Sequence, residues 1–247
     1  MFSKRNDVSK ILEEMNDKQR ELYEILLLPI HEAKIEGYEI HENEIVSGFK
    51  YGKMFDADMS NIAVRFYSAL YNISEEDLLS KEKSFVKGDT MNSSLKYYKT
   101  KAEINEKWIR QKHCLANFWI LPMDIGRTVK GLSETEVLYC KHSRKSKIFD
   151  YMDLFLDFLN NNLDYYFQNH ASYFEILKVS KNNFYEDFSS VHCIKCYYTN
   201  SEVRLIDKAK LKEDYNDWES LLKKRAVEIA TSPRWENVYN SLLTKSI

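Results

Sequence analysis

Apolar residues recur every three or four positions along most of this chain, and that spacing limits its fold more than any other feature. A period of this kind places apolar side chains on one face of an amphipathic helix. The chain has only 6 glycines and 3 prolines to interrupt such helices. The sequence therefore predicts a mainly α fold, an irregular multi-helix single domain over residues 1–247. The segments that show the period are residues 8–26, 60–72, 100–121, 148–159, 163–178, 184–198 and 206–231.

One region departs from the helical period. Between residues 37 and 55, Gly37, Gly48 and Gly52 separate aromatic and β-branched residues. Glycines placed in this way are typical of strands and their connections. We expect a small β hairpin or an ordered loop near residues 37–55.

Short motifs predict where some helices begin and end. Pro29 should end the first helix, because proline lacks the amide hydrogen that a helix interior needs. Ser74 with Asp77 three residues later is typical of a helix N-cap. Ser232 followed by Pro233 predicts the start of the last helix.

Composition is that of an ordinary globular protein. The chain has 36 Lys+Arg against 38 Asp+Glu, a formal charge of −2, and 44% hydrophobic residues. These values exclude a strongly basic, histone-like protein and a disordered chain. No apolar run approaches the roughly 20 residues of a membrane-spanning helix, and the first residues lack a secretory pattern. We expect a cytoplasmic protein with reduced cysteines and no membrane association.

Sequence motifs of several common enzyme classes are missing. The chain has no phosphate-binding P-loop, dinucleotide-binding glycine string, hydrolase nucleophile elbow or His-Glu-x-x-His zinc motif. Cys193 and Cys196 form a Cys-x-x-Cys string, but the residues around it suit a continuous helix or strand better than a zinc knuckle. We expect two buried thiols there, no metal site and no cofactor that the sequence can name.

Positive charge is concentrated between residues 95 and 147. This segment holds 12 Lys and Arg against 5 Asp and Glu, a net +7, which leaves −9 for the rest of the chain. Tyr97, Tyr98 and Trp108 lie among the basic residues. Basic and aromatic residues together are typical of surfaces that bind phosphate and stack bases. The alternative is that these lysines only cover the solvated faces of helices.

A polar string precedes this segment, at residues 88–94. Asp89 and Asn92 lie in it among short hydroxyl side chains, which could orient a ligand, a water molecule or a metal ion. The alternative is a turn and a helix N-terminus, where the same side chains satisfy free backbone amides.

A second polar string begins at His113 and extends to Arg127. On a helix His113 and Asn117 would share one face, so an imidazole that exchanges protons would lie one turn from an amide that positions it or a substrate. The alternative is a hydrogen-bonded pair that locks a helix against its neighbour.

The two strings carry a resemblance. A loose group of uncharacterised bacterial proteins has strings that resemble Gly88-Asp89-Thr90-Met91-Asn92-Ser93, His113-x-Leu115-Ala116-Asn117-Phe118-x-x-Leu121-Pro122, the following Gly126-Arg127 and the predicted helix at Asp150-Tyr151-Met152-Asp153. That resemblance covers about 70 residues in the middle of the chain and implies no particular activity. The second string also distantly resembles the distal part of HNH-type nuclease domains. The chain lacks the upstream His-x-x-Pro string that supplies the catalytic histidine of that family.

Two functional hypotheses follow from these residues. In the first, the protein binds nucleic acid or a nucleotide in a bacterial defence or toxin-like system, with hydrolysis as one version. Asp89 would then hold a metal ion or water, His113 would act as general acid or base, and Asn92, Asn117 and Arg127 would bind the ligand. In the second, the protein is a non-catalytic protein–protein interaction module, and the same residues serve as caps and core hydrogen bonds. The sequence leaves enzymatic activity and oligomeric state open.

Overall fold

The computed structural model describes residues 8–29, 61–79, 85–89, 114–122, 163–195, 198–199, 202–203 and 215–243. These residues are mainly helical, which confirms the predicted fold class. The β element expected near residues 37–55 and the helix expected at 148–159 lie outside them. Within these residues the α-helices are α1 (Val8–Glu14), α2 (Asp17–Leu27), α3 (Asn61–Tyr71), α4 (Glu75–Leu79), α8 (Leu163–Asn169), α9 (Ala171–Leu177), α10 (Phe184–His192), α12 (Tyr215–Ala230) and α13 (Trp235–Leu243).

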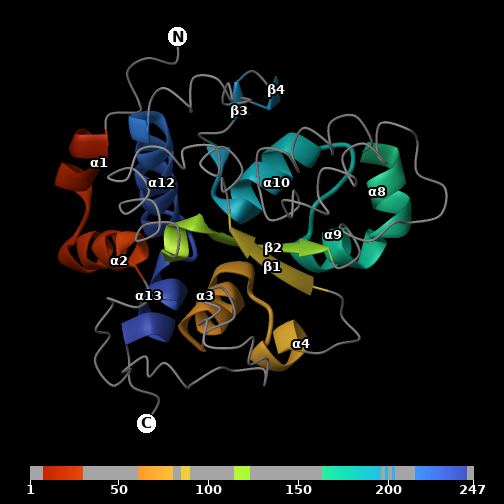
Figure 1. The fold of residues 1–247 in the computed structure, drawn as a ribbon, viewed down its shortest axis with the longest axis horizontal. Helices are drawn as coiled ribbons and strands as arrows, with labels where there is room; N and C mark the ends of the chain where they lie inside the picture. Colours follow the sequence, from red (N-terminus) through yellow and green to blue (C-terminus); the bar gives the residue numbers. More distant parts are fainter. Residues whose placement is uncertain are drawn as a thin grey trace, which may run out of the picture.

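Two antiparallel strand pairs accompany the helices. Strand β1 (Phe85–Asp89) pairs with β2 (Phe118–Pro122), and the short β3 (Tyr198–Thr199) pairs with β4 (Glu202–Val203). The β1–β2 pair lies at the centre of the molecule in Figure 1, with α3 and α4 on one side and α10 on the other. Helices α12 and α13 lie beside α1 and α2 at one end, where α12 packs on α2 and α13 packs on α3.

The first predicted helix is two helices. The break lies at Asn16, which is the N-cap of α2. The Asn16 side chain accepts the Gln19 backbone amide, and the Gln19 side-chain oxygen accepts the Asn16 backbone amide, so the capping box is complete. Pro29 does end α2, as predicted, and its backbone forms a bridge with Cys114. The helix predicted over 163–178 is likewise divided into α8 and α9 at His170.

Two other predicted helix starts differ in outcome. The Ser74 hydroxyl accepts the Asp77 amide and α4 begins at Glu75, which confirms that N-cap. The last helix begins at Trp235 and not at Pro233. The Ser232 hydroxyl does accept the Arg234 amide, as an N-cap would, but its carbonyl accepts the Trp235 amide in a turn that precedes the helix.

The helix predicted over residues 100–121 is wrong where the structure describes it. Leu115–Asn117 form a single 3-10 turn, labelled η3, and the next five residues form β2. Phe118, Trp119 and Ile120 are all completely buried, so they form a strand that is apolar on both faces. A short apolar run of this type has the same composition as a buried helix segment, and only the pairing with β1 distinguishes the two.

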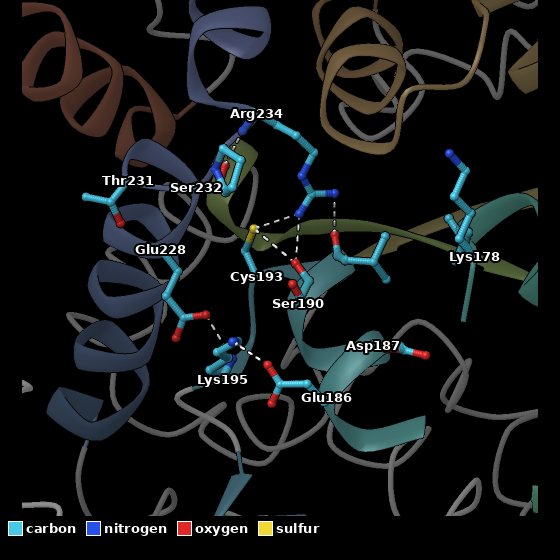
Figure 2. Close-up of a pocket in the computed structure, with 13 residues that line it drawn as sticks. Lys178, Glu186, Asp187, Ser190, Cys193, Lys195, Glu228, Thr231, Ser232 and Arg234 are labelled. Carbon is cyan, nitrogen blue, oxygen red and sulfur yellow. Dashed lines mark hydrogen bonds and ion pairs between the residues drawn. The ribbon is translucent and has the colours of Figure 1, made fainter. Parts of the chain in front are cut away.

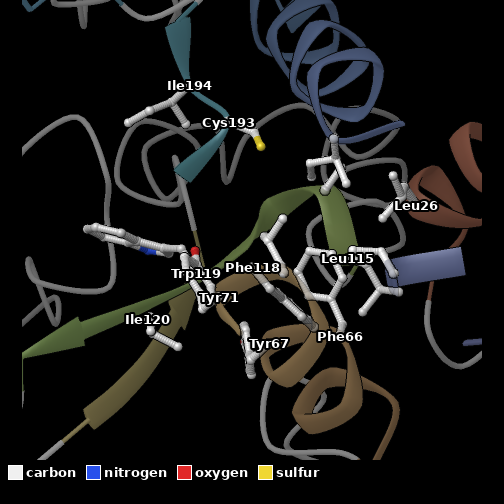
Figure 3. Close-up of a cluster of buried hydrophobic side chains, with 14 of the residues drawn as sticks. Leu26, Phe66, Tyr67, Tyr71, Leu115, Phe118, Trp119, Ile120, Cys193 and Ile194 are labelled. Carbon is white, nitrogen blue, oxygen red and sulfur yellow. The ribbon is translucent and has the colours of Figure 1, made fainter. Parts of the chain in front are cut away.

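A single cluster of buried side chains connects these elements. Phe66, Tyr67 and Tyr71 of α3 lie against Phe118 and Trp119 of β2 in Figure 3. Leu26 of α2 and Leu115 of η3 extend the cluster toward α12. None of the helices in the described ranges is both long and apolar enough to cross a lipid bilayer.

Candidate functional site

The β1–β2 pair brings the two predicted polar strings together. Asp89, the last residue of β1, is the backbone partner of Phe118, the first residue of β2. Asn117 therefore lies next to the residue that faces Asp89 across the strand pair. His113, Asn92 and Arg127 lie outside the described residues.

Asn117 is held differently from the prediction. It ends the 3-10 turn, its amide donates to the Cys114 carbonyl at 2.9 Å, and Cys114 itself has extended backbone angles. Asn117 therefore does not lie in the α-helix that the prediction requires. Asn117 is completely buried, which agrees with the alternative that its side chain is an internal structural group.

A buried polar cluster that sequence reasoning missed is centred on His192, the last residue of α10. Its Nδ1 lies 2.9 Å from the Tyr71 hydroxyl and its Nε2 lies 3.1 Å from the Tyr173 hydroxyl. The Tyr173 hydroxyl donates its proton to the Ile120 carbonyl at 3.0 Å. Tyr173 of α9 thus binds both the imidazole and the edge of β2.

The environment of His192 favours its neutral form. The residue is completely buried, and the imidazole packs against the rings of Trp119 at 5.7 Å and Phe188 at 4.3 Å. Burial, and then the Arg225 and Arg234 guanidiniums, hold the pKa of His192 well below its usual value. Burial also raises the pKa of Tyr71 to about 12, so both partners stay uncharged near neutral pH.

Arg225 of α12 is a second buried polar residue of this cluster. It follows Lys223 and Lys224 in the sequence, yet its side chain is completely buried. Its Nε donates to the His192 carbonyl at 3.1 Å and its Nη1 donates to the Ala116 carbonyl at 2.7 Å. Its Nη2 is buried without a hydrogen-bond partner among the described residues. A signal was present, because Leu221, Leu222, Ala226 and Ile229 place position 225 inside the apolar stripe of α12.

Arg225 joins the two parts of the candidate site. One nitrogen binds the turn that contains Asn117, and another binds the end of α10. Bonds from a cation to carbonyls at a helix C-terminus are favourable, because those carbonyls carry partial negative charge and lack partners within the helix.

Next to this cluster is an open pocket of about 590 Å³, between the end of α10 and the end of α12 (Figure 2). Its floor contains the buried Cys193 thiol, and burial raises the pKa of that thiol. Arg234 lies above it and donates to the Leu70, Val191 and Ser190 carbonyls and, at 3.4 Å, to Cys193 Sγ. The guanidinium therefore caps the ends of α3 and α10.

The carboxylates of the pocket are engaged by donors of the protein itself. Lys195 donates its ammonium to Glu186 at 2.7 Å and its amide to Glu228 at 2.8 Å. Asp187 accepts the Ser180 amide and hydroxyl and the Asn183 amide nitrogen, and these bonds lower its pKa. The pocket is therefore a junction of internal contacts, and it offers no cluster of three or more metal-ligating side chains among the described residues.

Cys193 is one of the two thiols of the Cys-x-x-Cys string. It is buried and unbonded to another cysteine, as expected, and it ends α10 in the left-handed conformation. Cys196 lies outside the described residues.

No family model, curated protein or solved structure matches this chain. The resemblances to uncharacterised bacterial proteins and to HNH-type domains remain predictions.

Proposed function

We propose that the protein binds nucleic acid or a nucleotide through residues 95–147. The observation that carries this proposal is the net +7 of that segment in a chain whose remainder is −9. A concentration of positive charge with interleaved aromatic residues attracts phosphates and provides rings for base stacking.

The strand pairing supports this proposal. Residues 90–113 connect Asp89 to Cys114, and they carry six positive and two negative side chains. Because Asp89 pairs with Phe118, both ends of that connection are attached to the same end of the β1–β2 pair. Cys114 is completely buried and bridged to Pro29, so one end is attached to the protein core. The two attachment points of this basic segment therefore lie at one place on the fold.

The hydrolytic version of the proposal assigns roles to the ends of this connection. Asp89 directly precedes it and His113 is its last residue. Asp89 pairs with Phe118, which follows His113 by five residues in the sequence. Asp89 would hold a metal ion or water, His113 would move a proton, and Asn92 would bind the ligand. Arg127, five residues beyond β2, would contact phosphate.

The binding proposal is tested by titrating labelled single-stranded RNA and DNA at several salt concentrations. Replacing Lys96, Lys99 and Lys101 together by glutamine should reduce the slope of log K against log salt by about 2, since each phosphate contact on a single strand contributes about 0.7. The matched control replaces the exposed Lys10, Lys178 and Lys181 and should leave the slope unchanged. Equal slopes in both triple variants would contradict the proposal.

Hydrolysis is tested separately. Cleavage of the same strands is measured with magnesium or manganese in the wild type and in the Asp89→Ala and His113→Ala variants. Loss of cleavage with retained binding would support the assigned roles. Unchanged cleavage in both variants would remove them.

The second candidate is a non-catalytic protein–protein interaction module. The complete burial of Asn117 favours it, because a buried amide acts as an internal hydrogen-bonding group and not as a ligand contact. Absence of salt-dependent binding to any strand would support this function, and a pull-down would then identify the partner.

A further inference from the structure

The imidazole of His192 joins separate parts of the fold. It ends α10, its two ring nitrogens contact Tyr71 of α3 and Tyr173 of α9, and its ring packs on Trp119 of β2. The first of these contacts links residues 121 positions apart in the sequence. Loss of this one side chain from its site would therefore loosen α10 from three elements at once.

The hydrogen bonds determine which ring nitrogen carries the proton. Tyr173 has one hydroxyl proton and donates it to the Ile120 carbonyl. The contact between Tyr173 and Nε2 can then be a hydrogen bond only if Nε2–H is the donor. The bare Nδ1 must accept the hydroxyl proton of Tyr71. His192 is thus a neutral imidazole with both nitrogens satisfied. A second proton on Nδ1 would face the Tyr71 hydroxyl proton, so that O–H would have to rotate away before the hydroxyl oxygen could accept from Nδ1–H.

The charged groups around this site are cations. Arg225 of α12 binds the His192 carbonyl, and Arg234 binds the carbonyls of the two preceding residues, Ser190 and Val191. Within the described part of the chain, these two guanidiniums are the charges that act on the imidazole. The other titratable groups next to it are the Tyr71 and Tyr173 hydroxyls and the Cys193 thiol, and Glu228 acts on that thiol.

We propose that protonation of His192 in acid releases the last turn of α10 and exposes the buried Cys193 thiol to solvent in the pocket. One proton from solvent binds Nδ1, which displaces the Tyr71 hydroxyl proton from its acceptor. The new imidazolium repels Arg225 and Arg234, the two cations that hold this same turn. Cys193 follows directly in the chain and accepts from Arg234, so it moves with the turn.

The experiment measures how fast a small neutral disulfide reagent labels Cys193 in the full chain, by mass spectrometry of the cysteine peptides. Each rate is divided by the rate for the same cysteine in urea at the same pH, which removes the intrinsic pH dependence of the thiolate. The released imidazole has its ordinary pKa of 6.5. The relative rate should therefore rise up to about tenfold for each pH unit below that value.

Cys114 is the internal control, because it is completely buried but is the extended N-cap residue of η3 and does not belong to α10. It should stay protected while Cys193 becomes reactive. A parallel rise in both rates would mean global unfolding and would overturn the proposal.

Two histidine variants test whether the acid dependence of Cys193 labelling comes from the His192 imidazole. His192→Gln is neutral at every pH, so labelling of Cys193 should lose its acid dependence, whatever its absolute rate. His170→Gln removes the half-buried imidazole that stacks on Tyr166 and should keep the wild-type dependence. Acid-dependent labelling of Cys193 that persists in His192→Gln would refute the proposal.

A measurement on the wild type covers the case in which His192→Gln does not fold. The ¹⁵N chemical shifts of its ring should show a neutral imidazole protonated at Nε2 near pH 7. A ring protonated at Nδ1, or an imidazolium at that pH, would overturn the assignment on which the proposal depends.

Discussion

Replacing Arg225 by alanine should destabilise the protein by about 3–5 kcal/mol, and replacing it by methionine should cost less. The alanine variant removes two bonds from a charged donor, to the His192 and Ala116 carbonyls, each worth about 1.5–3 kcal/mol. We take the lower part of that sum because burial of the Arg225 cation itself costs free energy in the wild type, where Nη2 lacks a partner among the described residues. The alanine variant is relieved of that cost. Methionine relieves that burial of charge and fills the same volume, so it should cost about 1–3 kcal/mol.

The assay is urea unfolding followed by far-ultraviolet circular dichroism, with unchanged m-values as the sign that the unfolded state is comparable. Lys224→Ala is the matched control, since it removes a positive charge from the adjacent position, where the side chain is half-buried, and should change stability by about 0.5 kcal/mol or less. A loss below about 1 kcal/mol for Arg225→Ala would show that the two carbonyl bonds do not stabilise the fold and would refute this reasoning.

Three further substitutions test local features. The pKa of Tyr71 is raised from 10.0 to about 12, so the wild type should lose about 1.4 kcal/mol of stability for each pH unit above 10 until that value is reached. Tyr71→Phe should lack this alkaline loss in urea unfolding at pH 9 and 11, and an equal loss in both proteins would contradict the assignment. Lys178 ends α9 with φ 57°, so Lys178→Gly should raise the thermal midpoint by removing about 1 kcal/mol of backbone strain, whereas Lys181→Gly should not raise it. Asn16→Ala removes the capping box of α2 and should cost about 1 kcal/mol in the same thermal measurement, and an unchanged midpoint would show that the cap is dispensable.

Much of the helical structure was predictable because its causes are local. The helical period predicts α3 and α10, and Ser74 starts α4 through a bond to a residue three positions away. The breaks at Asn16 and His170 were missed, although the Asn16 cap is also local, because an apolar face can continue across two helices that follow each other.

The candidate site was less predictable than the helices. Charge and residue type identify the basic segment and the strings at Asp89 and Asn117 from composition alone. They do not show that Asp89 faces Phe118 or that Asn117 ends a buried 3-10 turn. The first fact depends on strand pairing between residues 29 positions apart, which a helical period does not predict.

By itself, the sequence determined the helical class and where several helices begin, because side chains three or four positions apart meet within a single turn. The tertiary structure decided the strand β2 and the burial of Arg225 and His192. Arg225 binds a carbonyl 109 positions away and His192 contacts a hydroxyl 121 positions away. A buried polar group is stable only when such a distant partner satisfies it, so its place becomes visible only after the chain has folded.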